Sequence, residues 1–299
     1  MENNISGWLC LDKPAGISSN AAMSRIKRMI KTRMGYIGTL DPFATGVLPI
    51  ALGEARKFIP YVNEKQKTYI FTMVFGISTD SLDIDGKKNG ESDKIPSKTE
   101  LTAVLPTFLG YQQQIPPKFS AIKIKGQRAC DLTRQGKEVS LTAREVSIFS
   151  IDLLNEDLEQ SKEATIKVIC SKGTYIRSLA RDIAMALGTL AYVKSLQRTQ
   201  SGFFSINNAI ALEKLQKIED TNALVGLLLP LESPLDDIPA LYLSDEETKK
   251  LQNGLCISYD CCDASCSNVL IFERSSRTFK GIGSLLSNGT VKAVRMCSL

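Results

Sequence analysis

The stretch GYIGTLDPFATGVLPIALGEARK (35–57) surrounds one aspartate, Asp41, with turn-forming residues and then continues as an apolar run. Pro42 disfavours helical geometry at the residue before it, so Asp41 lies on extended or turning backbone. Gly38 and Gly46 allow another chain segment or a ligand to approach closely. Loops often carry catalytic groups, but aspartate is also a common turn former. On these residues alone, the turn-forming role is the simpler interpretation.

Length and charge distribution limit the class of protein. A chain of 299 residues suggests about two domains, and its hydrophobic content of 43% allows a packed core. The net charge of +5 is modest, yet lysine and arginine cluster in residues 25–33 and 118–137, whereas 152–163 is acidic. Such clusters suit phosphates. Solvated helix faces have the same composition, so charge alone leaves nucleic-acid binding open.

Eight cysteines and the absence of histidine restrict the chemistry. The N-terminus lacks a signal-like pattern, and the apolar run at 223–231 is too short to span a bilayer, so a reduced cytoplasmic protein is expected. The cluster CISYDCCDASC (256–266) contains no C-x-x-C pair, which favours free thiols over a metal site. Without histidine, any catalysis must use carboxylates, lysine, arginine, tyrosine or cysteine.

Hydrophobic periodicity and turn residues predict the main elements. Ser18 or Ser19 can cap a helix that extends to about Lys31, and Gly188 ends a second helix. The run 78–92 is expected to be a loop, and after Asp237 short strands alternate with Gly and Ser turns, which suggests a small β-rich appendage. The predicted strands lie at 8–11, 68–76, 164–171, 202–206, 269–272 and 291–294, and the predicted helices lie at 19–31, 176–187 and 244–251.

Six segments resemble the motifs of one enzyme family. The segment GTLDPFATGVLPIALGEARK resembles the catalytic motif of the TruB family of tRNA pseudouridine synthases, in which many positions are fixed. The other similar segments follow in the family's order across about residues 7–235. They are LDKPAGISSN (11–20), KTYIFTMVFGISTDSLDIDG (67–86), PPKFSAIKIKGQRA (116–129), CSKGTYIRSLARDIAMALG (170–188) and LQRTQSGFF (196–204).

The resemblance implies a fold and a domain division. We expect an α+β protein whose catalytic domain, residues 1–236, is a mixed, largely antiparallel sheet flanked by helices. Residues 237–299 resemble the small β-barrel, PUA-like RNA-binding domain that commonly follows it.

The resemblance also implies an activity. Family members isomerise a uridine, U55, in the TΨC arm of tRNA to pseudouridine. The expected partner is therefore tRNA, no membrane or metal is expected, and the protein is expected to be a monomer. The reaction breaks the N1–C1′ bond and joins C5 to C1′, so no cofactor is needed. Positive charge develops at the sugar carbon, and a carboxylate can stabilise or trap it. Asp41 matches the family's nucleophile.

Further site residues follow from the matched positions. Arg177 corresponds to an arginine that keeps the aspartate ionised and oriented. Tyr69 corresponds to a tyrosine that stacks on the target uracil and can relay a proton. Tyr175 and Leu196 correspond to residues that line the pocket. Lys13 corresponds to a lysine near the site that can meet phosphate or support the loop.

Three positions depart from the family's pattern. Tyr36 stands where the family usually has a histidine, five residues before the aspartate, which fills the space that the flipped base leaves. Tyrosine can still stack into that gap, but it forms different hydrogen bonds. Arg56 replaces a smaller residue, and Cys130 replaces an aromatic one.

Two alternatives lie outside this activity. One is an RNA-folding helper that keeps the RNA grip and has lost catalysis, although the aspartate, tyrosine and arginine are all present. The other is a carbohydrate enzyme that pairs Asp41 with Asp80, Asp83 or Asp85. Those three acids lie in a predicted loop without an acid/base context, which weakens this alternative.

Overall fold

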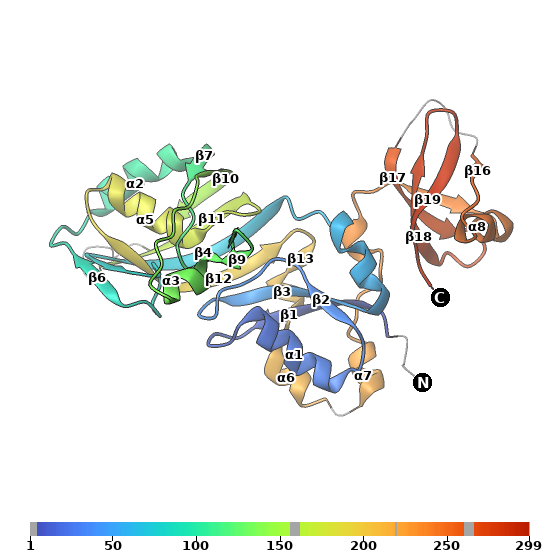
Figure 1. Cartoon of the computed structure of the whole chain (residues 1–299), viewed down its shortest axis with the longest axis horizontal. Helices are drawn as coiled ribbons and strands as arrows, with labels where there is room; N and C mark the ends of the chain where they lie inside the picture. Colours follow the sequence, from blue (N-terminus) through green and yellow to red (C-terminus); the bar gives the residue numbers. More distant parts are fainter. Residues whose placement is uncertain (1–4, 156–161, 219, 260–265, 299) are drawn as a thin grey trace.

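The computed structural model describes residues 5–155, 162–218, 220–259 and 266–298. A large mixed sheet with helices on one of its faces forms the main body (Figure 1). A second, smaller sheet at the C-terminal end lies to one side of it.

The main sheet has ten strands and is largely antiparallel. Only the β1–β14 and β3–β12 pairs are parallel. Two short strands, β2 (Met34–Tyr36) and β13 (Phe204–Ser205), pair with β3 and β12. The other eight follow the order β14 (Ile210–Ala211), β1 (Gly7–Lys13), β3 (Thr45–Leu52), β12 (Ala191–Ser201), β4 (Gln66–Phe75), β11 (Glu163–Ser171), β10 (Arg144–Leu153) and β7 (Gly110–Gln114).

Helices cover one face of this sheet and bury its largest apolar cluster. Helix α1 begins after Ser18, whose hydroxyl accepts a hydrogen bond from the amide of Ala21. Helix α5 ends before Gly188, which has a φ of 69°. Burying the apolar stripes of these helices against the sheet supplies most of their stability. The covering helices are α1 (Ser19–Met29), α2 (Lys98–Val104), α5 (Ile176–Ala186), α6 (Leu212–Gln216) and α7 (Thr221–Val225).

The connections between these elements carry small secondary structures of their own. The run 78–92, expected to be a loop, instead holds most of a two-stranded ribbon between residues 77–79 and 88–91. A second ribbon and a short helix form an extension from the main body within residues 118–137. The elements are β5 (Ile77–Thr79), β6 (Lys88–Glu91), β8 (Lys123–Ile124), β9 (Gln127–Arg128), α3 (Ala129–Arg134) and the 3-10 helices η1 (Gly53–Tyr61), η2 (Leu105–Phe108), η3 (Ile206–Asn208) and η4 (Ser233–Leu235).

Of the strand predicted near 202–206, only Phe204 and Ser205 are confirmed as strand. The long strand β12 ends at Ser201, Gly202 forms a turn with a φ of 54°, and only two residues of β13 follow. Strand β12 lies in the middle of the sheet, yet its sequence AYVKSLQRTQS alternates apolar and polar residues irregularly. Two register shifts against β4 explain that irregular alternation.

The C-terminal residues form a five-stranded sheet with one helix. Strands β15 and β17 are parallel, and the other pairs are antiparallel. Helix α8 (Asp245–Gln252) begins with a capping box between Ser244 and Glu247. The strand order is β15 (Ala240–Leu243), β17 (Cys266–Glu273), β18 (Phe279–Leu285), β19 (Thr290–Met296) and β16 (Ile257–Ser258).

A shared apolar cluster joins the small sheet to the main sheet. Phe58, on the 3-10 helix that follows β3, is fully buried and packs edge-on against Phe279 of β18, with ring centroids 5.2 Å apart. Next to this contact, Lys57 donates hydrogen bonds to Glu54 and to the Ser298 hydroxyl. The segment that follows Asp41 in sequence therefore also holds the C-terminal sheet.

The sequence predicts neither a membrane-spanning segment nor a metal site. Within the described ranges, no helix is long and apolar enough to cross a membrane. The same residues contain no group of three or more potential metal ligands. Of the cysteine cluster at 256–266, residues 260–265 lie outside the described part of the chain.

Replacing Phe58 with alanine tests the contact between the sheets. Because the ring is fully buried, we expect Phe58→Ala to lower the free energy of unfolding by about 3–5 kcal/mol, measured by urea denaturation. Phe149→Ala removes the same ring from a half-exposed position and should change stability by only about 0.5 kcal/mol. Equal losses in the two variants would contradict this account of the junction.

Candidate active site

Asp41 lies on a loop that the start of α1 holds in place. The Ser19 hydroxyl accepts a hydrogen bond from the Leu40 amide at 2.8 Å and donates one to the Leu40 carbonyl at 3.0 Å. On the other side of the aspartate, the Gly16 amide donates to the Pro42 carbonyl at 2.9 Å. Ser19 and Leu40 are buried, whereas the Asp41 side chain keeps 32% of its exposure. The carboxylate therefore extends from a fixed loop into accessible space.

Arg177 contacts both carboxylate oxygens of Asp41. Its Nη2 donates a hydrogen bond to Oδ1 at 3.1 Å, and its Nε lies 2.9 Å from Oδ2 as a charge contact without hydrogen-bond alignment. The arginine lies in the first turn of α5 and is almost fully buried. Its remaining N–H groups donate to the carbonyls of Ser81 and Phe119. This side-on geometry fixes the orientation of the carboxylate.

A second carboxylate, Asp83, pairs with the same arginine. Its Oδ2 lies 3.2 Å from Nη1 of Arg177, and its Oδ1 accepts hydrogen bonds from the Ser81 hydroxyl and the Asp85 amide. Burial raises the pKa of Asp83, and the Ser81 hydroxyl and Arg177 oppose that shift. The guanidinium thus bridges Asp41 and Asp83. Asp83 is buried behind the arginine, which is the wrong place for the second catalytic carboxylate of a carbohydrate enzyme.

Tyr69 lies on β4, close to Asp41. It pairs with Arg198 of β12 on one side and with Val168 of β11 on the other. Burial raises the pKa of the Tyr69 phenol, the Arg198 charge lowers it, and the Asp41 charge raises it. The structure therefore brings together an aspartate from a loop, an arginine from a helix and a tyrosine from a central strand.

Tyr175 and Leu196 lie at the edges of this group. The side-chain amide of Gln114 accepts a hydrogen bond from the Tyr175 amide at 2.8 Å and donates one to its carbonyl at 3.1 Å, which fixes the start of α5. Burial raises the pKa of Tyr175, which interacts electrostatically with Asp41. Leu196 lines a cleft of about 550 Å³ together with Phe43, which follows the Asp41 loop.

Lys13 is buried beneath the Asp41 loop. Its Nζ donates to three carbonyls, those of Pro14, Ile17 and Pro42. Burial lowers its pKa to about 8, and the Asp41 charge opposes that shift. With its donors satisfied inside the protein, Lys13 is placed to support the loop, which is the second of the two roles expected for it.

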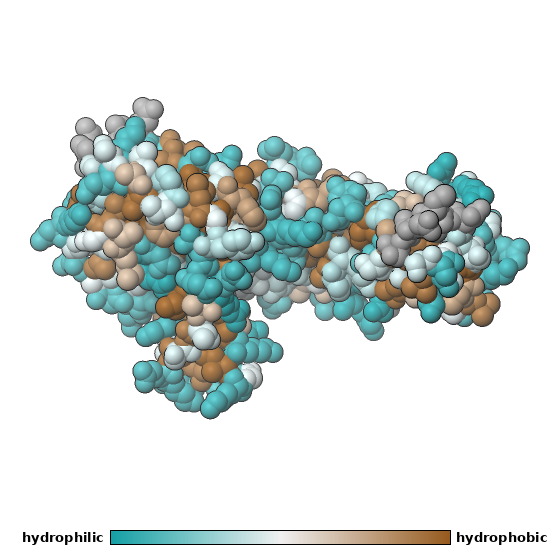
Figure 2. Space-filling view, turned by 90° about the horizontal axis from the view of Figure 1, so that it is seen from above, coloured by the Kyte–Doolittle hydropathy of each residue, from teal (hydrophilic) through white to brown (hydrophobic). Residues whose placement is uncertain are grey.

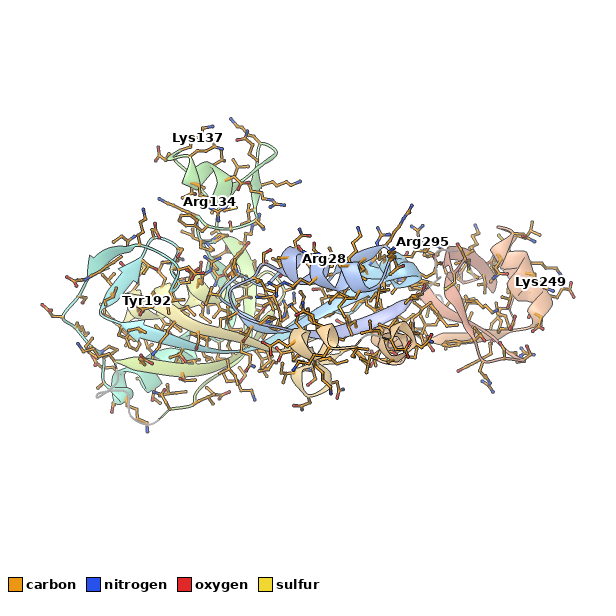
Figure 3. All side chains as sticks on the ribbon, turned by 90° about the horizontal axis from the view of Figure 1, so that it is seen from below. Arg28, Arg134, Lys137, Tyr192, Lys249 and Arg295 are labelled. Carbon is orange, nitrogen blue, oxygen red and sulfur yellow. The ribbon has the colours of Figure 1, made fainter. Side chains whose placement is uncertain are left out.

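Tyr36 and the basic segments surround the site. Tyr36 ends β2, pairs with Ile50, and is half-buried against the main core. Arg28 lies on the exposed side of α1 (Figure 3). Arg134 and Lys137 lie on the extension formed by residues 118–137, on the same edge of the molecule. The space-filling view shows hydrophilic residues at the tip of that extension (Figure 2).

Three supporting residues were not predicted in these roles. Asp83 was considered only as a partner in carbohydrate chemistry, and Gln114 and Arg198 received no role. The sequence STDSLDIDG indicates an acid-rich turn, but it does not show that Asp83 lies next to Arg177. Gln114 comes from the edge strand β7, 61 residues before Tyr175, so no local pattern could connect the two.

Two family models match the chain. The model described as "TruB family pseudouridylate synthase (N terminal domain)" matches residues 27–176, and "tRNA pseudouridylate synthase B C-terminal domain" matches residues 177–236. A protein of Caulobacter vibrioides named tRNA pseudouridine synthase B is 47% identical over 254 residues, which cover 85% of this chain and 81% of the relative. A protein of Zymomonas mobilis with the same name is 45% identical, with 84% of each chain covered.

Solved structures share the fold at lower identity. An H/ACA RNP bound to a substrate RNA containing 2′-deoxyuridine matches with a TM-score of 0.70 and 20% identity, covering 97% of this chain and 84% of that one. A Cbf5-Nop10-Gar1 complex matches with a TM-score of 0.69 and 21% identity, covering 98% and 85%.

The matches define the class of this protein, because the two family models cover residues 27–236, which include Asp41, Tyr69 and Arg177. It is a pseudouridine synthase, and therefore an isomerase. Within that class, the chain belongs to the TruB family of tRNA pseudouridine synthases.

Exchanging Arg177 for lysine tests the role of the guanidinium. An ammonium group cannot contact both oxygens of Asp41, Asp83 and two carbonyls at once, so Arg177→Lys should slow single-turnover pseudouridine formation by about 10²–10³-fold. Arg181→Lys is the matched control, one turn further along α5, where the arginine contacts Asp182 and the Ile115 carbonyl. A rate for Arg177→Lys equal to that of the control would contradict the assigned role.

Proposed function

We propose that this protein converts uridine 55 in the T arm of tRNA to pseudouridine, with Asp41 as the nucleophile. The observation that carries this proposal is the contact of the buried Arg177 with both oxygens of a partly exposed Asp41. The guanidinium places its positive charge against the carboxylate and fixes its orientation, so that an oxygen can face the developing positive charge at C1′.

Tyr69 would supply the second part of the chemistry. A uracil that leaves the sugar must be held over a flat surface while it rotates, and an aromatic ring offers one. Once C5 has bonded to C1′, the C5 proton must leave. The Tyr69 oxygen can accept that proton, and the C5–H electron pair then returns to the ring. Tyr175 and Leu196 would enclose the rotating base.

The target nucleotide must leave the folded arm before it can react. Flipping costs a few kcal/mol, and an aromatic residue that fills the vacated space would offset part of that cost. Tyr36 ends the strand that leads into the Asp41 loop, so we assign it this role. The basic faces of α1 and of the extension at 118–137 would grip the surrounding phosphates.

The C-terminal sheet would extend this RNA-binding surface. We propose that residues 1–236 form the catalytic domain and residues 237–299 a PUA-like RNA-binding domain. The separate core of the five-stranded sheet and the end of the second family match at residue 236 support this division. Arg295 and Lys249 lie on this part of the molecule (Figure 3). We further propose that the protein acts as a monomer in the cytoplasm.

Asp41→Asn tests the nucleophile. The substitution removes a charge and little volume, so pseudouridine formation in a tRNA transcript should be abolished while the Kd for tRNA changes by less than about threefold. Base-by-base mapping of pseudouridine also tests the target position. The proposal fails if the Asn variant modifies tRNA at the unmodified enzyme's rate.

The salt dependence of the Kd for tRNA tests whether α1 contacts RNA phosphates. If Lys27 and Arg28 each meet a phosphate, the double alanine variant should reduce the slope of log Kd against log salt by about 1–2. Lys98→Ala removes an exposed lysine from α2, on a different part of the molecule, and should leave that slope unchanged. An unchanged slope in the double variant would exclude α1 from the binding surface.

A further inference from the structure

The two glycines that bracket Asp41 both contact a single residue, Arg198. A Cβ atom on Gly38 would lie 3.0 Å from Nη1 of Arg198 and 2.6 Å from Nζ of Lys67. A Cβ atom on Gly46 would collide with the backbone of Arg198, which pairs with Gly46 across β3 and β12. The close approach of Arg198 therefore explains why both ends of the loop are glycine.

The guanidinium of Arg198 fastens both ends of the Asp41 loop. Nη2 donates to the Gly38 carbonyl at 2.8 Å, before the aspartate, and Nε donates to the Val47 carbonyl at 2.8 Å, after it. Arg198 has no solvent exposure. A fully buried arginine that donates only to neutral carbonyls is costly unless its charge interacts with something else.

One nitrogen of that guanidinium has no aligned partner. Nη1 of Arg198 is among the few buried side-chain nitrogen or oxygen atoms of the described residues that lack a hydrogen bond. Arg198 pairs directly with Tyr69 across β12 and β4, so the two side chains lie on the same face of the sheet, and Arg198 lowers the pKa of the Tyr69 phenol against the larger effect of burial. The cross-strand pairing makes the phenol oxygen of Tyr69 a candidate acceptor for Nη1 on that face of the sheet.

The groups around the Tyr69 phenol come from several elements. Arg198 faces it from β12, Cys170 from β11 and Asp41 from the loop. Burial has the largest effect and raises the pKa of the phenol, Cys170 and Asp41 raise it further, and of these three side chains only Arg198 lowers it. Lys67, two residues before Tyr69, pairs with Glu64 at 3.0 Å, so an acid partly offsets that second cation.

We propose that Arg198 is a positioning residue for Tyr69, which holds the phenol against the Asp41 loop through Nη1 and stabilises its ionised form. The inference rests on the proposed function in one respect, because an ionised phenol matters only if Tyr69 takes the C5 proton. The phenol first releases its proton to solvent. The phenolate oxygen then accepts the C5 proton and becomes neutral again while the C5–H electron pair returns to the uracil ring, so no other reactant is consumed. Arg198 itself is buried and never touches the RNA.

Fluorine NMR of the free protein tests this coupling without RNA. The tyrosines are replaced by 3-fluorotyrosine, and the signal of residue 69 is assigned by its loss in Tyr69→Phe. Arg198→Gln removes the cation, so the pH midpoint of this signal should rise by about one unit or more. Asp41→Asn removes an anion and should lower the same pH midpoint. It is therefore the control for the direction of the shift.

An unchanged midpoint in a folded Arg198→Gln variant would overturn the proposal. If that variant does not fold, the fluorotyrosine-labelled protein without other substitutions tests the contact. The proposal requires a nuclear Overhauser effect between the residue 69 fluorine and a guanidinium proton of Arg198. Its absence would refute the contact. Failure of the proposed function gives a different result. In that case Tyr69→Phe would form pseudouridine normally while the midpoints still shift as described.

Discussion

The contact between Asp41 and Arg177 is the interaction on which the rest of the site depends. A carboxylate on a surface loop would be mobile and fully hydrated, whereas this one is held side-on by a buried guanidinium. The arginine in turn needs partners for its other nitrogens, and Asp83, Ser81 and Phe119 supply them. The Arg177 guanidinium thus connects the Asp41 loop, the acid-rich turn after β5, and the basic extension.

The sheet positions this pair by register. Lys13, Gly46, Arg198 and Tyr69 occupy one row across β1, β3, β12 and β4. Gly46 has no side chain, so the flanking cations can approach the loop from both sides. Lys13 holds the Pro42 carbonyl and Arg198 holds those of Gly38 and Val47, so the loop around Asp41 is fastened at three points. Buried cations bonded to loop carbonyls give rigidity that apolar packing alone would not specify.

Much of this architecture follows from sequence, and the missing parts share a physical cause. The helices at 19–29 and 176–186 follow from caps and periodicity, and the strands at 7–13, 66–75 and 163–171 follow from apolar and β-branched runs. Strand β12 escaped prediction because its bulges break the alternation. The trio of Asp41, Tyr69 and Arg177 was predicted only through family resemblance, since isolated residues of these types are ordinary. Arg198 was missed because its contacts are all with residues distant in sequence.

The central claim is that the Asp41 carboxylate meets the sugar carbon of an extruded uridine while Arg177 holds it. A crystal structure of the protein with a T-arm RNA that binds but does not react measures this directly. The account predicts a flipped nucleotide whose C1′ lies about 3–3.5 Å from an Asp41 oxygen, with the contacts to Arg177 retained. A target base that remains stacked in the arm, or a C1′ atom beyond about 6 Å from that carboxylate, would contradict it.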